Sequence, residues 1–154
     1  MPANNGLLDA VNLRILAEFA EDARVSLAEL GRRVGLCAPA VGERVARLEA
    51  EGVITGYRVQ LNPRALGLQL GIVLRVRPAA RMIDKVAQAA RDSEEVVLCE
   101  RITGDDCFWL RAYVRDVDHL EELIDRFTPF GQTTTSVVQS APVALRGPAL
   151  PAQA

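Results

Sequence analysis

Apolar residues recur at helical spacing in three short segments of the first third of the chain, and each segment predicts a helix. These segments are residues 8–20, residues 26–35 and residues 38–52. Ser26 and Glu29 form a capping box at the start of the second segment, and Gly35 is typical of a helix end. Three short helices, of which the last two are joined by a tight turn that contains glycine, match a helix-turn-helix.

After Gly52 the hydrophobic period changes from that of a helix to that of a strand. Residues 53–61 alternate and predict a strand or small wing. Segments of strand (s) and helix (h) period then follow in the order s-h-s-s-h-s, at residues 70–76, 83–90, 96–102, 108–114, 116–127 and 132–140. This order is that of a ferredoxin-like βαββαβ sandwich.

The sequence therefore predicts an α+β protein with two domains. An N-terminal winged helix-turn-helix domain would occupy residues 1–60, followed by a linker at residues 61–69 that contains proline and glycine. The ferredoxin-like domain would occupy residues 70–141. The proline-containing tail, residues 142–154, is expected to be disordered.

The predicted sheet has one face without covering helices. The side chains expected on that open face are Val73, Arg75, Val97, Cys99, Trp109, Arg111 and Val137. These residues are too apolar for a fully solvated face. We therefore expect a second subunit, related by a two-fold axis, to cover it.

Composition narrows the classes of function. The 154 residues include one histidine, His119, and three cysteines, Cys37, Cys99 and Cys107, in no metal-ligand spacing, so we expect no metal site and no cofactor. No apolar run could span a membrane and the N-terminus lacks the pattern of a signal peptide, so we expect a cytoplasmic protein without a membrane partner. The net charge of −2 means that DNA binding would need a local basic patch.

The third predicted helix begins with small side chains and then presents arginines away from the core. In a helix-turn-helix this helix enters the major groove N-terminus first, so small residues allow close approach to base edges and arginines reach phosphates. The candidate DNA-contacting residues are Arg32, Arg33, Ala38, Pro39, Ala40, Glu43, Arg44 and Arg47. The alternative is a protein-interaction module in which Arg44 or Arg47 pairs with a nearby glutamate; Arg44 in particular could be partly structural.

Several motifs resemble the Lrp/AsnC family of transcription regulators (leucine-responsive regulatory protein and asparagine regulator). They lie at residues 8–9 (Leu-Asp), 47–49 (Arg-Leu-Glu), 52–57 (GVITGY) and 103–105 (Thr-Gly-Asp), with a Thr-rich last strand, and the resemblance covers residues 8–145. It implies sequence-specific binding to double-stranded DNA by homodimers, which in this family often assemble into octamers. It also implies a small effector, usually an amino acid, bound between C-terminal domains.

Carried over to this chain, the resemblance places the effector site at Thr103, Gly104, Asp105, Asp106, Thr134, Thr135 and Ser136. A free amino acid needs an anion for its ammonium group, which Asp105 or Asp106 would supply. Its carboxylate needs donors, which the backbone near Gly104 and the hydroxyl groups would supply. Without the resemblance, the Gly-Asp-Asp stretch would be read as a hairpin turn.

Three positions depart from the family pattern. Cys37 stands where many members carry serine, which removes a helix cap worth about 1 kcal/mol and places a thiol that oxidation could reach; a buried, inert thiol is the alternative. Cys107 stands where aspartate is common, which weakens the case for an ordinary amino-acid effector. Asn12 replaces an aspartate in the first helix, where we expect only a local change in capping.

Two other functions remain open. One is an architectural DNA-binding protein that needs no effector. The other is an enzyme, because some haem-biosynthesis decarboxylases resemble this architecture, but they usually carry histidines around their substrate and this chain has only His119. No nucleophile with a base, paired carboxylates or phosphate-binding loop is visible, so we expect no catalytic residues.

Overall fold

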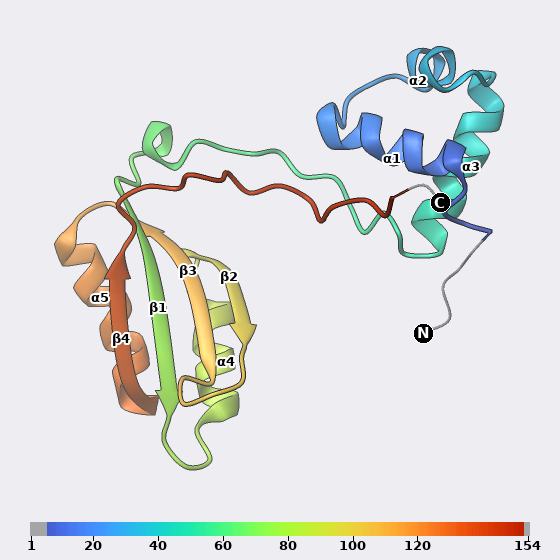
Figure 1. Ribbon diagram of the computed structural model, residues 1–154. Helices are drawn as coiled ribbons and strands as arrows, with labels where there is room; N and C mark the ends of the chain where they lie inside the picture. The colour runs from blue at the N-terminus through green and yellow to red at the C-terminus, as the bar shows by residue number, and fades with distance from the viewer. Residues whose placement is uncertain (1–5, 153–154) are drawn as a thin grey trace. The chain divides into compact units, whose positions relative to one another are not determined.

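The computed structural model describes residues 6–152, and these divide into two compact units. One unit extends to Val59 and includes the C-terminal segment from Val143, and the other is Gln60–Pro142 (Figure 1). The first is a helix-turn-helix domain and the second an antiparallel sheet with helices, which confirms the predicted α+β fold class. Residues 1–5, with which the predicted domain 1–60 and the N-terminal segment without a signal-peptide pattern begin, and residues 153–154, with which the predicted tail ends, lie outside the described residues.

The N-terminal domain consists of three helices in the predicted places. They are α1 (Ala10–Glu21), α2 (Leu27–Val34) and α3 (Ala38–Ala50). Ser26 caps α2 by accepting a hydrogen bond from the Glu29 amide, and Gly35 ends the helix at a φ of 77°. Their apolar faces form one core, made of Leu7, Ile15, Leu30, Val34, Val41, Val45 and Leu48.

The turn between α2 and α3 depends on the absence of a side chain at Gly31. A Cβ atom there would lie 2.5 Å from the Leu36 carbonyl oxygen, which is closer than any real contact. The same carbonyl belongs to the backbone that leads directly into α3. Gly31 thus allows the two helices of the motif to approach each other.

The predicted wing strand at residues 53–61 is wrong: among the described residues this segment forms neither a strand nor a helix. The segment instead contacts the helices through Ile54 and Tyr57, while Val59 and Leu61 are exposed. The Tyr57 hydroxyl donates to Glu49 Oε1 at 2.9 Å, and the Tyr57 ring meets the Phe19 ring edge-on at 5.7 Å. Gly56, at a φ of 151°, interrupts the extended backbone next to Tyr57.

The second unit follows the predicted order of strands and helices. Its elements are β1 (Leu70–Pro78), α4 (Ile83–Asp92), β2 (Val96–Arg101), β3 (Phe108–Val114), α5 (Val117–Phe127) and β4 (Gly131–Val137), with short 3₁₀ helices at Pro63–Leu66 and Thr128–Phe130. The strands form one sheet in the order β2-β3-β1-β4, and all its pairs are antiparallel. This is the ferredoxin-like topology.

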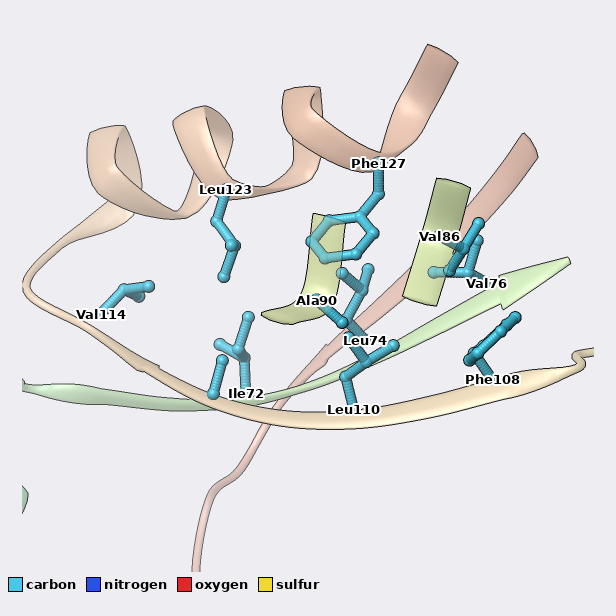
Figure 2. Packing of buried hydrophobic residues seen from close by; sticks show 11 residues of the cluster. Ile72, Leu74, Val76, Val86, Ala90, Phe108, Leu110, Val114, Leu123 and Phe127 are labelled. Atoms are coloured by element: carbon cyan, nitrogen blue, oxygen red, sulfur yellow. The ribbon is translucent and has the colours of Figure 1, made fainter. Parts of the chain in front are cut away.

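Both helices pack on the same face of this sheet. Figure 2 shows Leu123 and Phe127 of α5 above Ile72 and Leu74 of β1, with the α4 residues of the core nearby. The buried cluster is Ile72, Leu74, Val76, Val86, Ala90, Phe108, Leu110, Ala112, Val114, Leu123 and Phe127. Side chains alternate across a strand, so the intervening residues of β1 and β3 point to the other, open face.

The central strands carry the open-face residues that the sequence predicts. Val73 pairs with Arg111 and Arg75 pairs with Trp109 across β1 and β3, and paired residues of an antiparallel sheet share a face. All four side chains are half-buried. They leave a partly apolar face that no helix of the described chain covers.

In the edge strands two of the predicted open-face positions are wrong, and the register assigns a third to neither face. Cys99 pairs with buried Leu110 and Val137 pairs with buried Ile72, so both lie on the helix-covered side, and Val97 lies at an irregularity between Val96 and Leu98. That irregularity shifts the alternation of β2 by one residue. Strand β4 is mostly polar, so its own sequence does not identify its buried face.

A partly buried cluster of His119, Arg126 and Glu95 joins α5 to the turn before β2. His119 Nε2 lies 2.7 Å from Glu95 Oε1, and Arg126 donates two hydrogen bonds to the same carboxylate at 2.9 and 3.0 Å. The Arg115 amide donates to His119 Nδ1, so Nε2 carries the proton that is donated to Glu95. Burial opposes ionisation of Glu95, but the bonds from Arg126 and His119 outweigh it and lower its pKa to about 2.

We predict that Glu95 makes stability depend on pH. A carboxyl whose pKa falls from 4.5 to about 2 on folding stabilises the fold above pH 4.5, and this contribution is lost as the pH falls through the folded value. Between about pH 6 and about pH 3 the wild type should lose about 2 kcal/mol more unfolding free energy than Glu95→Gln. Urea titrations monitored by Trp109, the chain's single tryptophan, measure this difference; equal losses in both proteins would contradict it.

Candidate nucleic-acid interface and effector site

Helix α3 presents a narrow exposed stripe that contains three of the candidate DNA-contacting residues. Pro39, Glu43 and Arg47 are four residues apart and all exposed, whereas Ala38 and Ala40 are half-buried. The Cys37 side chain makes no capping bond, as expected for cysteine, and proline occupies the first turn. The helix therefore begins with free backbone amides and almost no side-chain bulk.

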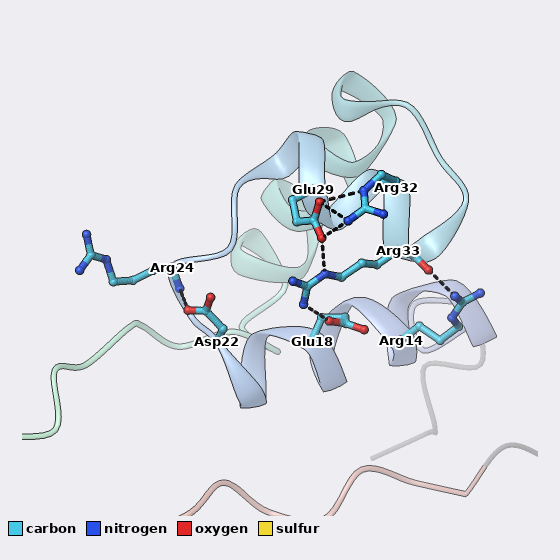
Figure 3. Close-up of polar contacts among 7 residues, drawn as sticks. All are labelled: Arg14, Glu18, Asp22, Arg24, Glu29, Arg32 and Arg33. Atoms are coloured by element: carbon cyan, nitrogen blue, oxygen red, sulfur yellow. Dashed lines mark hydrogen bonds and ion pairs between the residues drawn. The ribbon is translucent and has the colours of Figure 1, made fainter.

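Arg32 and Arg33 lie together at the end of α2, but acidic side chains already hold both (Figure 3). Glu29 accepts from Arg32 at 2.6 Å and from Arg33 at 2.7 Å, and Arg33 also pairs with Glu18 of α1 at 2.7 Å. Arg32 and then Arg33 lower the pKa of Glu29, and the two glutamates raise that of Arg33. Two positive and two negative charges thus cancel locally, which leaves little net field for DNA.

Arg44 lies on the side of α3 that faces the start of α1. Its guanidinium donates to Asp9 Oδ2 at 2.7 Å and to Asn12 Oδ1 at 2.9 Å. Asn12 is 4% exposed and donates in turn to the Leu7 carbonyl. The Asn12 amide and then Arg44 lower the pKa of Asp9, which also caps α1. Arg44 therefore ties the recognition helix to the first helix through a chain of polar contacts.

Arg47 is the exception among the four candidate arginines. Within residues 6–152 it has no ion pair and no hydrogen bond from its side chain, and it is exposed. The sequence predicts Arg44 and Arg47 on one face, although at helical spacing Arg44 lies closer to the Val41 side than Arg47 does. The structure separates them because Asp9, distant in sequence, lies beside one of them and not the other.

The candidate effector residues come from two places around β1. Thr103, Gly104, Asp105 and Asp106 form the loop between β2 and β3, which an Ile102–Cys107 backbone bond closes. Thr134, Thr135 and Ser136 lie in β4, on the other side of β1. Gly104 adopts a φ of 105°, which suits a turn residue without a side chain.

Both aspartates of the loop pair with arginines of β1 that the sequence analysis did not link to them. Asp106 Oδ2 lies 3.2 Å from Arg75 Nη1, and this pair is partly buried. Asp105 Oδ2 lies 2.7 Å from Arg77 Nη2, but Asp105 is 87% exposed, so solvent weakens this pair. The sequence did contain a signal for these partners, because Arg75 and Arg77 are two charged residues on one face of an otherwise apolar strand.

Of the three β4 candidates, only Thr134 lies directly beside this ionic site. Thr134 pairs with Arg75 across the strands and shares the open face with it. Ser136 lies on the same face beside Val73, whereas Thr135 pairs with buried Leu74 on the helix-covered side. Arg75, Asp106 and Thr134 therefore form the compact part of the predicted site.

Two further kinds of site, a metal site and a membrane-spanning helix, are absent from the described residues. Residues 6–152 contain no group of three or more His, Cys, Asp or Glu side chains placed to hold a metal ion. In the same range no helix is long and apolar enough to cross a membrane. All three cysteines are free, with Cys37 exposed and Cys107 half-buried.

Comparison with known proteins gives matches to both domains. Residues 8–49 match the AsnC-type helix-turn-helix domain and residues 72–148 the Lrp/AsnC ligand binding domain. The regulator LrpC of Bacillus subtilis is 30% identical over 86% of this chain and 92% of its own, and its structure superposes with a TM-score of 0.85 over 90% and 99% of the two chains. A Mycobacterium tuberculosis feast or famine regulatory protein, solved with L-methionine, is 30% identical with a TM-score of 0.84 over 91% and 97%.

We predict that Arg44 stabilises the helix-turn-helix domain through its contacts with Asp9 and Asn12. Arg44→Met should lower the unfolding free energy by about 1 kcal/mol, because it leaves half-buried acceptors without their donor. In an Asp9→Ser background, where serine still caps α1, the same change should cost less. Denaturation followed by far-ultraviolet circular dichroism gives both values, and equal costs in the two backgrounds would contradict the coupling.

Proposed function

We propose a mechanism for this chain from the premise that it belongs to the Lrp/AsnC family of transcription regulators. A homodimer or larger assembly binds double-stranded DNA by placing α3 in the major groove. The exposed stripe of α3, with small side chains at its start and an unpaired arginine one helical turn beyond Glu43, is the observation that carries this proposal. A cytoplasmic location follows from this proposal, since the named relatives are transcription regulators of bacteria.

Within this interface the arginines have different roles. Arg47 contacts a backbone phosphate, because its guanidinium is exposed and has no competing partner among the described residues. Arg44 positions α3 on α1 and contributes to DNA binding only through that position. Arg32 and Arg33 reach phosphates only if their bonds to Glu29 and Glu18 break or are shared.

The open face of the sheet forms the dimer interface. Val73, Trp109 and Tyr113 are half-buried there although no helix covers them, and Leu98 adds a side chain that is 43% exposed. Contact between two such faces removes this apolar area from water in both subunits. The dimer joins two recognition helices in one particle, which suits a DNA site made of two half-sites.

The effector is a small zwitterion such as an amino acid, bound at the Arg75–Asp106 pair. An α-amino acid carries one negative and one positive group, so it can insert between the two side chains: Arg75 and Thr134 receive its carboxylate and Asp106 its ammonium. The related mycobacterial protein solved with L-methionine supports this class of ligand. Asp106 supplies the carboxylate that family members commonly carry at position 107, where this chain has a cysteine.

Effector binding changes DNA affinity only if the ligand prefers one assembly or arrangement of subunits over another. The rival proposal is an architectural protein that binds DNA without an effector. An enzyme of haem biosynthesis is less well supported, since the named relatives are transcription regulators and the one histidine, His119, is committed to Glu95. The protein is therefore proposed to have no catalytic role.

We predict that Arg47 accounts for part of the salt dependence of DNA binding. Fluorescence anisotropy with the duplex upstream of the protein's own gene should give a salt slope shallower by about 0.9 per recognition helix for Arg47→Ala, or about 1.8 for a dimer, since each subunit loses one phosphate contact. Arg44→Met should weaken binding with little change in slope. Arg115→Ala, an exposed change in the other domain, is the control and should match the wild type. An unchanged slope for Arg47→Ala would rule out its phosphate contact.

We predict that an effector raises thermal stability and that Arg75 is required for this effect. A panel of amino acids, beginning with L-methionine, should include one that raises the melting temperature of the wild type by mass action. Arg75→Gln and Asp106→Asn should abolish the rise, because each removes one partner of the zwitterion. Arg77→Gln, which breaks the exposed neighbouring pair, should retain it. No response to any ligand, together with equal binding to unrelated duplexes, would favour the architectural protein.

A further inference from the structure

Arg111 is the only arginine of the described sheet whose charge is left unmatched at the centre of the open face. It lies in β3, an inner strand, and its cross-strand neighbours Val73 and Leu98 are both apolar. Its Nε atom is buried without a hydrogen-bond partner. No carboxylate of residues 6–152 lies within ion-pair distance of it.

The Arg111 side chain is directed along β3, over the ring of Tyr113. The guanidinium carbon lies 5.5 Å from the centre of that ring. Gly71, the residue of β1 that pairs with Tyr113, leaves room for the Tyr113 ring, since a Cβ there would lie 3.3 Å from Tyr113 Cε1, a tight contact. The guanidinium thus lies beside the Tyr113 ring, with no carboxylate partner among the described residues.

An unpaired guanidinium is acceptable only while water reaches it. If a second sheet covers the face, the charge loses that water, and burial of an unpaired charge is strongly unfavourable. A dimer through this face must therefore bring an acceptor to Arg111. An anionic side chain of the second copy meets this need without any further ligand.

Glu100 is the one acidic residue of the open face, among those described, that has no partner. It pairs with Trp109 across β2 and β3 and so shares the face with Arg111. It is exposed and forms neither an ion pair nor a hydrogen bond within the described chain. Asp106 and Asp105, the other acids near this face, are held by Arg75 and Arg77.

Glu100 and Arg111 are diagonal neighbours within one sheet, yet they do not pair there. Arg111 lies beside Leu98, two residues before Glu100, and its guanidinium is directed toward Tyr113, away from the Trp109–Glu100 end. The two opposite charges are therefore both available on one face and displaced from each other. In a dimer with a two-fold axis, a contact between Arg111 of one subunit and Glu100 of the other occurs twice, because the axis exchanges the two subunits.

We propose that Arg111 forms an ion pair with the partner subunit's Glu100, twice in each dimer, an inference that rests on the proposed dimerisation through the open face. The two pairs fix the register of the two sheets, which the apolar contacts alone leave free to slide. They also give the interface a charge pattern that a sheet lacking either residue would not match.

Charge reversal in the full-length chain tests the pair. Sedimentation velocity over a concentration series should show that Glu100→Arg and Arg111→Glu each raise the dimer dissociation constant at least about tenfold, because like charges then meet. The double reversal should restore the dissociation constant most of the way to the wild-type value. Glu121→Arg, an exposed reversal on α5 behind the sheet, is the control and should leave it unchanged.

The possible results test the ion pair and the dimer separately. A wild type that stays monomeric at all concentrations overturns the proposed dimer and the pair with it. A wild-type dimer that tolerates both single reversals, or that the double reversal does not restore, overturns the pair alone. If circular dichroism shows that a reversal unfolds the chain, Glu100→Gln and Arg111→Met replace it: non-additive losses of dimer affinity support the pair, and additive losses overturn it.

Discussion

The ferredoxin-like domain depends on one constraint: both of its helices cover the same face of a four-stranded sheet. Ile72, Leu74 and Leu110 gain a complete core from α4 and α5, whereas Val73 and Trp109 on the opposite face gain none. Exposed apolar area costs about 25 cal/mol per Å², so the open face favours a second layer. In the proposed dimer a second copy would supply that layer and at the same time bring two helix-turn-helix domains together, which would connect the packing of one sheet to recognition of DNA.

The charged residues divide into those satisfied within the chain and those left for a partner. Arg33 and Arg44 are held by Glu18 and Asp9, and they support the shape of the helix-turn-helix domain. Arg47 has no such partner among the described residues and is available to phosphate. Contacts of the first kind stabilise the domain, and we propose that those of the second kind give it affinity for DNA, so a mutation in one group should not reproduce a mutation in the other.

The sequence predicted the elements well but not the contacts between distant ones. Ser26 and Gly35 mark the ends of α2 because capping is local chemistry. The wing failed because alternation at residues 53–61 does not reveal whether a strand lies alongside. Cys99 was assigned to the wrong face because a one-residue irregularity in β2 reverses the side of every later residue. Arg44 looked like a DNA contact because Asp9 is 35 positions away in sequence.

The most direct test of this account is the number of chains bound to one duplex. Sedimentation of the complex with the DNA upstream of the protein's own gene measures that number without assuming an effector. The account predicts an even number of chains, since the open sheet faces pair before or upon binding and each pair presents two copies of α3. A stable complex that contains one chain per duplex would show that DNA recognition needs neither the covered face nor a second recognition helix, and would contradict it.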